Sequence, residues 1–82
     1  MGKKRDTVVY ELYDNRKKVY IGITDDPIRR EQEHKDEGKN FKSMKVITPK
    51  LKNESAIERE EQMIEMYQKN HNGRMPRYNK KK

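Results

Sequence analysis

Two neighbouring segments rich in β-branched and aromatic residues, 7–13 and 18–23, constrain the fold more than any other feature. The residues between them, Asp-Asn-Arg-Lys at 14–17, are typical turn formers, so a β-hairpin is predicted. Its register matters, because a slip of one residue moves a side chain to the other face of the sheet. A loop with an odd residue count would place Tyr10 across from Tyr20, whereas a four-residue loop would place them on opposite faces. The sequence leaves both open.

A helix is predicted over 27–37. Asp26 offers a side-chain acceptor at the N-cap, Pro27 suits the first helical position, and Gly38 is a plausible stop. The segment is almost entirely polar, and Ile28 is its one clear core residue. Helix propensity and charge pairs are therefore expected to contribute much of its order.

A short third strand is predicted at 44–48, ended by Pro49. The second helix is expected to open with a capping box, since Ser55 and Glu58 have the spacing that satisfies each other's free backbone donors. The predicted fold class is therefore α/β of the α+β kind. A small three-stranded antiparallel sheet, the hairpin plus the third strand, is flanked by helices.

Glu60 stands out on the second predicted helix. Ala56, Met63, Ile64 and Tyr67 recur there at helical spacing and form an apolar stripe. Glu60 lies four residues after Ala56 and four before Ile64, so it points along the stripe. Burying a carboxylate there costs free energy unless a cation or several hydrogen-bond donors pair with it. It is predicted either to pair with an Arg of the neighbouring helix or to bind metal or take part in catalysis.

The charge balance favours a polyanionic partner. Lys and Arg number 21 against 14 Asp and Glu, the formal charge is +7, and the sequence pI is about 9.7. Nucleic acid is the first candidate and a membrane surface is disfavoured, because no segment pairs a broad apolar face with a basic one. A charge excess kept for solubility is the simpler alternative. Cysteine is absent, which excludes disulfides, thiolate metal sites and a cysteine nucleophile.

Length and composition predict one domain over 1–82, with its core at about 7–79 and charged ends that fray. Leu, Ile, Val and Phe together make up only 13 of 82 residues, so a disordered basic peptide is a competing interpretation. Tyr and Met, five of each, supply further apolar area. No apolar stretch has the length of a signal peptide or a membrane span, and a soluble cytoplasmic protein is expected.

Several landmarks then occur in the order of a known family. Val8-Val9-Tyr10 and, ten residues after that tyrosine, Tyr20-Ile21-Gly22 resemble the two half-motifs of the GIY-YIG nuclease family. That family has an essential arginine ten residues past the second motif tyrosine, where this chain has Arg30. Its phage homing endonucleases often carry a histidine one turn later, and here that residue is His34.

The resemblance covers about residues 7–79. Glu60, four residues after a small residue and four before an isoleucine, matches the metal-binding glutamate of the phage homing endonucleases and of the excision-repair nuclease subunit. Tyr78-Asn79 matches the Tyr-Asn pair that ends many members. Two departures are present. Val8 stands where the family usually has glycine, and the 38–44 link is too short for the helical insert of some relatives.

The resemblance implies a divalent-metal-dependent endonuclease that hydrolyses phosphodiester bonds of DNA. Tyr10 would take a proton from the attacking water, its pKa lowered by nearby positive charge. Arg30 would hold the phosphate and stabilise the transition state. Glu60 would be the single protein carboxylate ligand of one Mg²⁺ or Mn²⁺ ion, with waters and substrate oxygens completing the shell.

The remaining implied catalytic residues have supporting roles. Tyr20 and His34 would orient the water or the phosphate, and Asn79 would order the local network. The plainer alternatives are a strand aromatic for Tyr20 and an exposed surface histidine for His34. The tail Lys80–Lys82 is expected to be solvated or to add phosphate contacts, and His71 and Tyr13 carry no signal beyond packing.

Sequence specificity is expected to be low, or supplied by a partner protein, because no helix is built for major-groove readout. The sequence leaves open whether the chain acts as a homodimer. The main rival interpretation is a nucleic-acid-binding or interaction module that keeps this fold without activity. The presence of Tyr10, Tyr20, Arg30, Glu60 and Asn79 argues against such loss.

Overall fold

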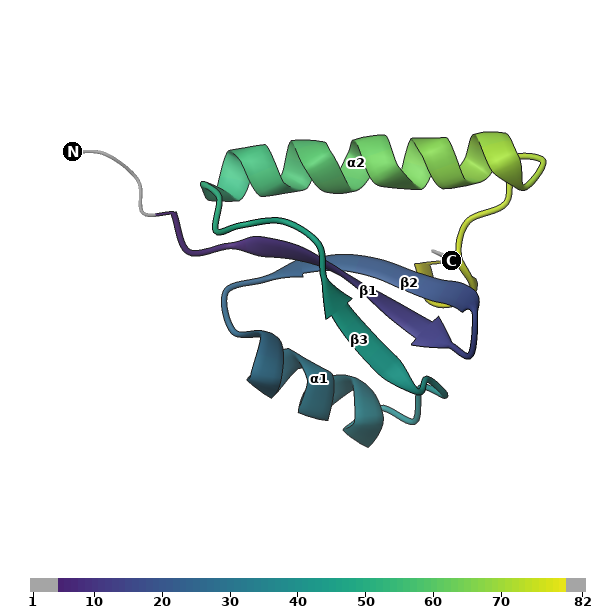
Figure 1. The fold of residues 1–82 in the computed structure, drawn as a ribbon, viewed down its shortest axis with the longest axis horizontal. Helices are drawn as coiled ribbons and strands as arrows, with labels where there is room; N and C mark the ends of the chain where they lie inside the picture. Colours follow the sequence, from purple (N-terminus) through teal and green to yellow (C-terminus); the bar gives the residue numbers. More distant parts are fainter. Residues whose placement is uncertain (1–4, 80–82) are drawn as a thin grey trace.

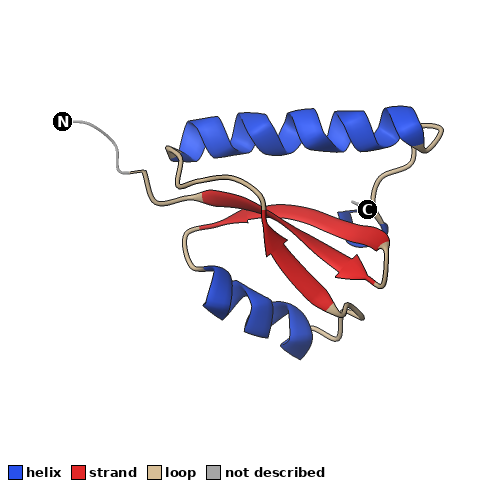
Figure 2. Ribbon diagram, in the orientation of Figure 1, coloured by secondary structure: helices blue, strands red, loops and turns tan. Residues whose placement is uncertain are grey.

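The computed structural model describes residues 5–79, so the predictions for both charged ends, Lys80–Lys82 included, lie outside the described residues. It is a small α+β domain with one three-stranded antiparallel sheet, as predicted (Figure 1). The strand order, which the sequence did not predict, is β2-β1-β3. Helix α2 crosses one face of the sheet and helix α1 lies on the other (Figure 2). The elements are β1 (Val8–Asp14), β2 (Lys17–Thr24), α1 (Pro27–Asp36), β3 (Ser43–Val46), α2 (Asn53–Asn70) and the 3₁₀ turn η1 (Arg77–Asn79).

The predicted hairpin forms, and a β-bulge sets its register. Next to the turn, Tyr13 pairs with Lys18, and continuing that register would put Tyr10 and Tyr20 on opposite faces. A bulge between Leu12 and Tyr13 adds one residue to β2, so that Leu12 pairs with Tyr20 instead. Because of this extra residue, the side chains of Tyr10 and Tyr20 point to the same face of the sheet, where they are diagonal neighbours. The sequence left open direct opposition and opposite faces, and the observed arrangement is neither of these.

The two-residue connection Asn15-Arg16 closes the hairpin, with Asn15 at φ 62°, in the left-handed region that asparagine tolerates. Strand β2 is an edge strand, whereas β1 is central and pairs with both neighbours. An edge strand leaves backbone groups for other segments to bind. This matters for the site, because Tyr20 lies on that strand.

Helix α1 begins and ends close to the predicted residues. The Asp26 carboxylate accepts a hydrogen bond from the Arg29 amide at 3.1 Å, and Gly38 follows the helix at φ 86°. The expected core contact was wrong, because Ile28 is 83% exposed. The fully buried side chain of α1 is His34, six residues later and so well round the helix from Ile28. The side chain that α1 packs against the sheet is therefore the imidazole of His34, a polar group.

Strand β3 ends at Val46, before the predicted end at residue 48. Thr48 instead uses its hydroxyl to accept a hydrogen bond from the Val9 amide at 3.0 Å. Helix α2 begins at Asn53, two residues before the predicted start, so the expected capping box is absent. The first helical bond runs from the Ala56 amide to the Lys52 carbonyl at 2.9 Å, which places Ser55 inside the first turn.

Two apolar clusters cover the two faces of the sheet. Beneath α2, Val9, Ile21 and Ala56 are buried and the predicted helix stripe packs on them, so that prediction is confirmed. The second cluster centres on Tyr10, Leu12 and Val19 and includes the ring of Tyr20. Within residues 5–79 no helix combines the length and apolar character needed to cross a bilayer.

Candidate functional site

Tyr10, Tyr20 and His34 form a packed aromatic cluster between the hairpin and α1. The Tyr10 hydroxyl lies 2.6 Å from His34 Nε2. The ring centroids are 5.9 Å apart for Tyr10 and Tyr20, and 4.8 Å apart for Tyr20 and His34, which meet edge to face. Tyr10 and His34 are both fully buried, whereas Tyr20 keeps some exposure. Tyr20 is therefore the phenol that solvent can reach.

Gly22 makes room for this cluster. A methyl group built on its Cα would lie 2.5 Å from the Tyr20 ring and 2.8 Å from the Tyr10 hydroxyl. Both contacts are far closer than van der Waals distance, and both rings are held by their neighbours. The glycine of the second half-motif thus has a steric reason: two phenols converge over it.

Arg30 reaches the cluster from α1. Its guanidinium interacts with both phenols and forms an ion pair with Glu33 at 2.9 Å, the largest cause of its raised pKa. The side chain is 30% exposed, so it is open to a ligand on its outer side. A phosphate bound there would compete with the Glu33 carboxylate for the same donors.

The pKa of Tyr10 corrects the prediction for its role. Burial raises this pKa far above the ordinary value of 10.0, and the nearby phenol of Tyr20 raises it further. The guanidinium of Arg30 lowers it, as expected from the sequence, but burial outweighs that effect. Tyr10 therefore stays a neutral phenol at physiological pH.

His34 is neutral for the same reason. Burial and the positive charges of Arg30 and Lys39 lower its pKa from 6.5 to about 4. Its buried Nδ1 has no hydrogen-bond partner among the described residues, and it faces the Glu37 carboxylate at 3.6 Å. That carboxylate favours the tautomer with the proton on Nδ1, which leaves Nε2 to accept the Tyr10 hydroxyl hydrogen. The expectation of an exposed surface histidine was wrong.

Taken together, the two pKa values disfavour proton transfer from Tyr10 to His34. The donor holds its proton more tightly than a free phenol does, and the acceptor is a weaker base than a free imidazole. The Tyr10–His34 hydrogen bond therefore fixes the two rings in place and supports the accessible Tyr20.

Glu60 lines a separate cleft of about 520 Å³ at the free edge of β2. Tyr20, Tyr78 and Asn79 line the same cleft, as do further residues of α2. Arg30 instead lines a cleft of about 600 Å³ with Glu33 and residues of the first strands. The structure thus divides the predicted site residues into two groups. Tyr20 connects the two groups, because it packs on His34 and interacts with Arg30 while it also lines the cleft of Glu60.

Asn79 ties the end of the chain to the strand that carries Tyr20. Its side chain accepts a hydrogen bond from the Ile21 amide and donates one to the Ile21 carbonyl, each at 2.8 Å. These bonds satisfy the outward backbone groups of the edge strand. Beside it, the Tyr78 hydroxyl accepts a hydrogen bond from the Asn40 amide at 2.9 Å. The loop after α2 brings Asn79 back to the edge of β2.

Among residues 5–79, no three His, Cys, Asp or Glu side chains come together as a metal site. A site built on one carboxylate would not need them, because Mg²⁺ commonly keeps several waters and takes one or two carboxylates. Glu60 is half-exposed on a cleft that Glu61 and Glu65 also line. The donor set therefore fits a hydrated Mg²⁺ or Mn²⁺ ion.

Two polar features were missed by the sequence analysis. Glu11 is 4% exposed in the central strand, paired with Lys18 at 2.6 Å and hydrogen bonded by the Tyr13 hydroxyl. The signal was present, since Glu11 lies two residues from Val9 on the face that α2 covers. The second is the face-to-face contact of Tyr67 and His71 at the end of α2.

Comparisons with protein-family models, with curated proteins and with solved structures give no match to this chain.

Proposed function

We propose that this chain is a divalent-metal-dependent DNA endonuclease of the GIY-YIG kind, with low intrinsic sequence specificity. The observation that carries the proposal is the position of Tyr20, between the buried Tyr10–His34 pair and the cleft of Glu60. Tyr20 thereby contacts residues of β1 and α1 and also shares a cleft with residues of α2 and η1. The order of the sequence landmarks and the charge of +7 support the same function.

Three solvent-accessible side chains each have one role in the hydrolysis of the phosphodiester bond. Tyr20 orients the attacking water at the mouth of the cleft, because it is the phenol that water can reach. Arg30 binds the scissile phosphate through its planar donors, exchanging Glu33 for a phosphate oxygen. Glu60 holds Mg²⁺ or Mn²⁺, and the bound ion would neutralise charge on the phosphate and assist departure of the 3′-oxygen.

The other predicted site residues position these three. Tyr10 and His34 are both fully buried and hydrogen bonded to each other, and they form a support beneath Tyr20. Asn79 holds the backbone of β2 next to Tyr20. Their substitution should therefore lower the rate by displacing Tyr20.

A second candidate function is a nucleic-acid-binding module without activity. The burial of Tyr10 and the separation of Arg30 from the Glu60 cleft favour this alternative. Both functions predict salt-sensitive binding to DNA, so binding alone does not separate them.

Nicking of supercoiled plasmid separates the two functions. The folded chain is incubated with plasmid in Mg²⁺, in Mn²⁺ and in excess chelator, and the nicked form is quantified over time. The nuclease should nick only with metal and leave 3′-hydroxyl and 5′-phosphate ends, which ligase can reseal. A folded protein that binds the plasmid but never nicks it would establish the binding module instead.

A further inference from the structure

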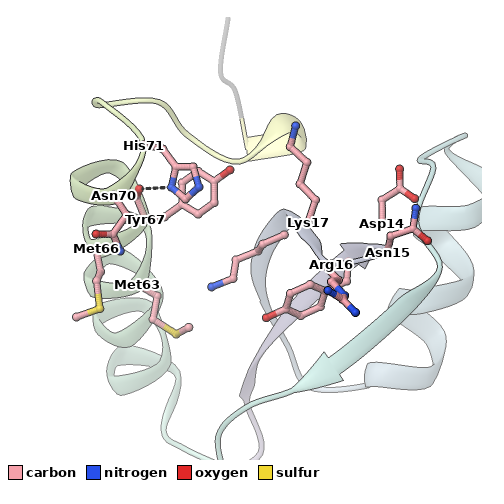
Figure 3. Close-up of a pocket in the computed structure, with 11 residues that line it drawn as sticks. Asp14, Asn15, Arg16, Lys17, Met63, Met66, Tyr67, Asn70 and His71 are labelled. Carbon is pink, nitrogen blue, oxygen red and sulfur yellow. Dashed lines mark hydrogen bonds between the residues drawn. The ribbon is translucent and has the colours of Figure 1, made fainter.

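A further cleft is lined by neither Arg30 nor Glu60. It has a volume of about 750 Å³ and separates the hairpin turn from the C-terminal half of α2 (Figure 3). Met63, Tyr67 and His71 line the helix side, and Arg16 and Lys17 line the turn side. A second cleft of about 710 Å³ shares Lys17, Tyr67 and His71 with it. The two form one continuous groove past the end of α2.

An aromatic stack stands where the two clefts meet. The rings of Tyr67 and His71 are 3.8 Å apart between centroids and 7° from parallel. His71 Nδ1 lies 2.8 Å from the Tyr67 carbonyl oxygen, to which it donates a hydrogen bond that fixes the imidazole plane. His71 is exposed and Tyr67 is half-buried against the core, so the outer ring rests on an anchored one. A flat aromatic ligand can extend this stack.

The rim of the groove is basic. Arg16 and Lys17 lie on the side of the hairpin, and Arg74 and Arg77 lie on the side of the loop after α2. Among the described residues that line the two clefts, Asp14 alone is acidic. Aromatic faces flanked by cations are the combination that holds single-stranded nucleic acid, since bases stack on the rings while the cations follow the phosphates.

The groove also leads to the proposed nuclease site. Met75 lines both the second cleft and the cleft of Glu60. Glu60 and Tyr67 are seven residues apart on α2, which corresponds to roughly 10 Å along the helix axis. A strand stacked on Tyr67 and His71 would thus pass within a short distance of Glu60.

We propose that this groove binds unpaired nucleotides of DNA, with a base stacked on His71, and that the preferred substrate carries a single-stranded segment. The inference rests on the proposed function, because it names the form of DNA that this nuclease acts on. A duplex keeps its bases stacked inside and has none to offer to the ring. The groove therefore discriminates between single-stranded and fully paired DNA.

Fluorescence anisotropy tests the groove without any cleavage. The full chain is titrated, in chelator, into a labelled oligo-thymidine strand and into a labelled duplex of equal length. His71→Ala should weaken binding of the single strand about fivefold or more, and binding of the duplex much less. His71→Phe keeps a ring without the nitrogen atoms and should retain most of the affinity. Since His71 is exposed, neither variant is expected to unfold the domain.

Equal loss on strand and duplex, or no loss with His71→Ala, would overturn the inference. The proposed function can fail separately. A chain that prefers the single strand through His71 but never nicks DNA would keep the groove and lose the nuclease. A chain that nicks plasmid with metal but keeps its full affinity for the single strand in His71→Ala would keep the nuclease and lose the groove.

Discussion

His34 should make the stability of this domain depend on pH between about 6.5 and 4. The ring is fully buried beneath Tyr20, and its pKa falls from 6.5 to about 4 because burial and neighbouring positive charges disfavour the protonated form. The perturbation that isolates this effect is His34→Gln. Glutamine can still accept the Tyr10 hydroxyl hydrogen but does not titrate.

The sign follows from the direction of the shift. Folding favours neutral His34, so the stability it contributes is fully present above pH 6.5 and is lost as pH falls toward 4. The whole difference corresponds to at most roughly 3 kcal/mol, of which about 2 kcal/mol is lost at pH 5. For a domain of this size a loss of about 2 kcal/mol lowers Tm by roughly 8–16 °C.

Thermal melts followed by circular dichroism at closely spaced pH values between 7.5 and 4 test this directly. Wild type should lose Tm steeply below pH 6.5, and His34→Gln should have a much shallower slope over that interval. His71→Gln is the matched control, because it removes the only other histidine, which is exposed. Parallel curves for wild type and His34→Gln would refute the assignment of His34 as a buried neutral group.

Three further substitutions test individual contacts. Gly22→Ala should lower the free energy of unfolding by about 1–3 kcal/mol, measured by urea titration, because the added methyl overlaps both phenols; unchanged stability would contradict the packing. Glu33→Gln should release Arg30 for phosphate and tighten DNA binding in anisotropy by up to about fivefold, the range of a partly exposed ion pair; weaker binding would argue against a phosphate role. Lys18→Met should cost about 1–3 kcal/mol in the same urea assay, because the buried Glu11 carboxylate loses its cation, and Glu11→Gln in that background should recover part of the loss.

The elements were predictable because their signals are local. Alternating β-branched residues, turn residues and an apolar helical stripe are properties of neighbouring positions, and each produced the expected element. The face shared by Tyr10 and Tyr20 was not predictable in this way. It depends on one extra residue in β2, opposite the step from Leu12 to Tyr13 in β1. No residue type there indicates a bulge. The capping-box prediction was wrong because the same spacing of serine and glutamate can occur inside a helix as well as at its start.

The sequence named the candidate site residues through the family resemblance, but it did not predict the environments in which they lie. Spacing identified Arg30 and His34 on one helix, but only packing shows that His34, and not Ile28, faces the sheet. The pKa of Tyr10 was predicted in the wrong direction, because the nearby charge was foreseen and the degree of burial was not. Burial is a property of the whole assembly of elements, so it cannot be read from the spacing of residues.

The central claim is that Glu60 supports metal-dependent cleavage, and metal-dependent nicking by Glu60→Gln tests it most directly. The substitution removes one charge from α2 and keeps the size of the side chain, and Glu58→Gln makes the same change at an exposed position of the same helix. Nicking of plasmid in Mg²⁺ or Mn²⁺ should fall by two orders of magnitude or so in Glu60→Gln and stay at the wild-type rate in Glu58→Gln, with both variants melting cooperatively. Equal nicking rates for Glu60→Gln and wild type would contradict the account.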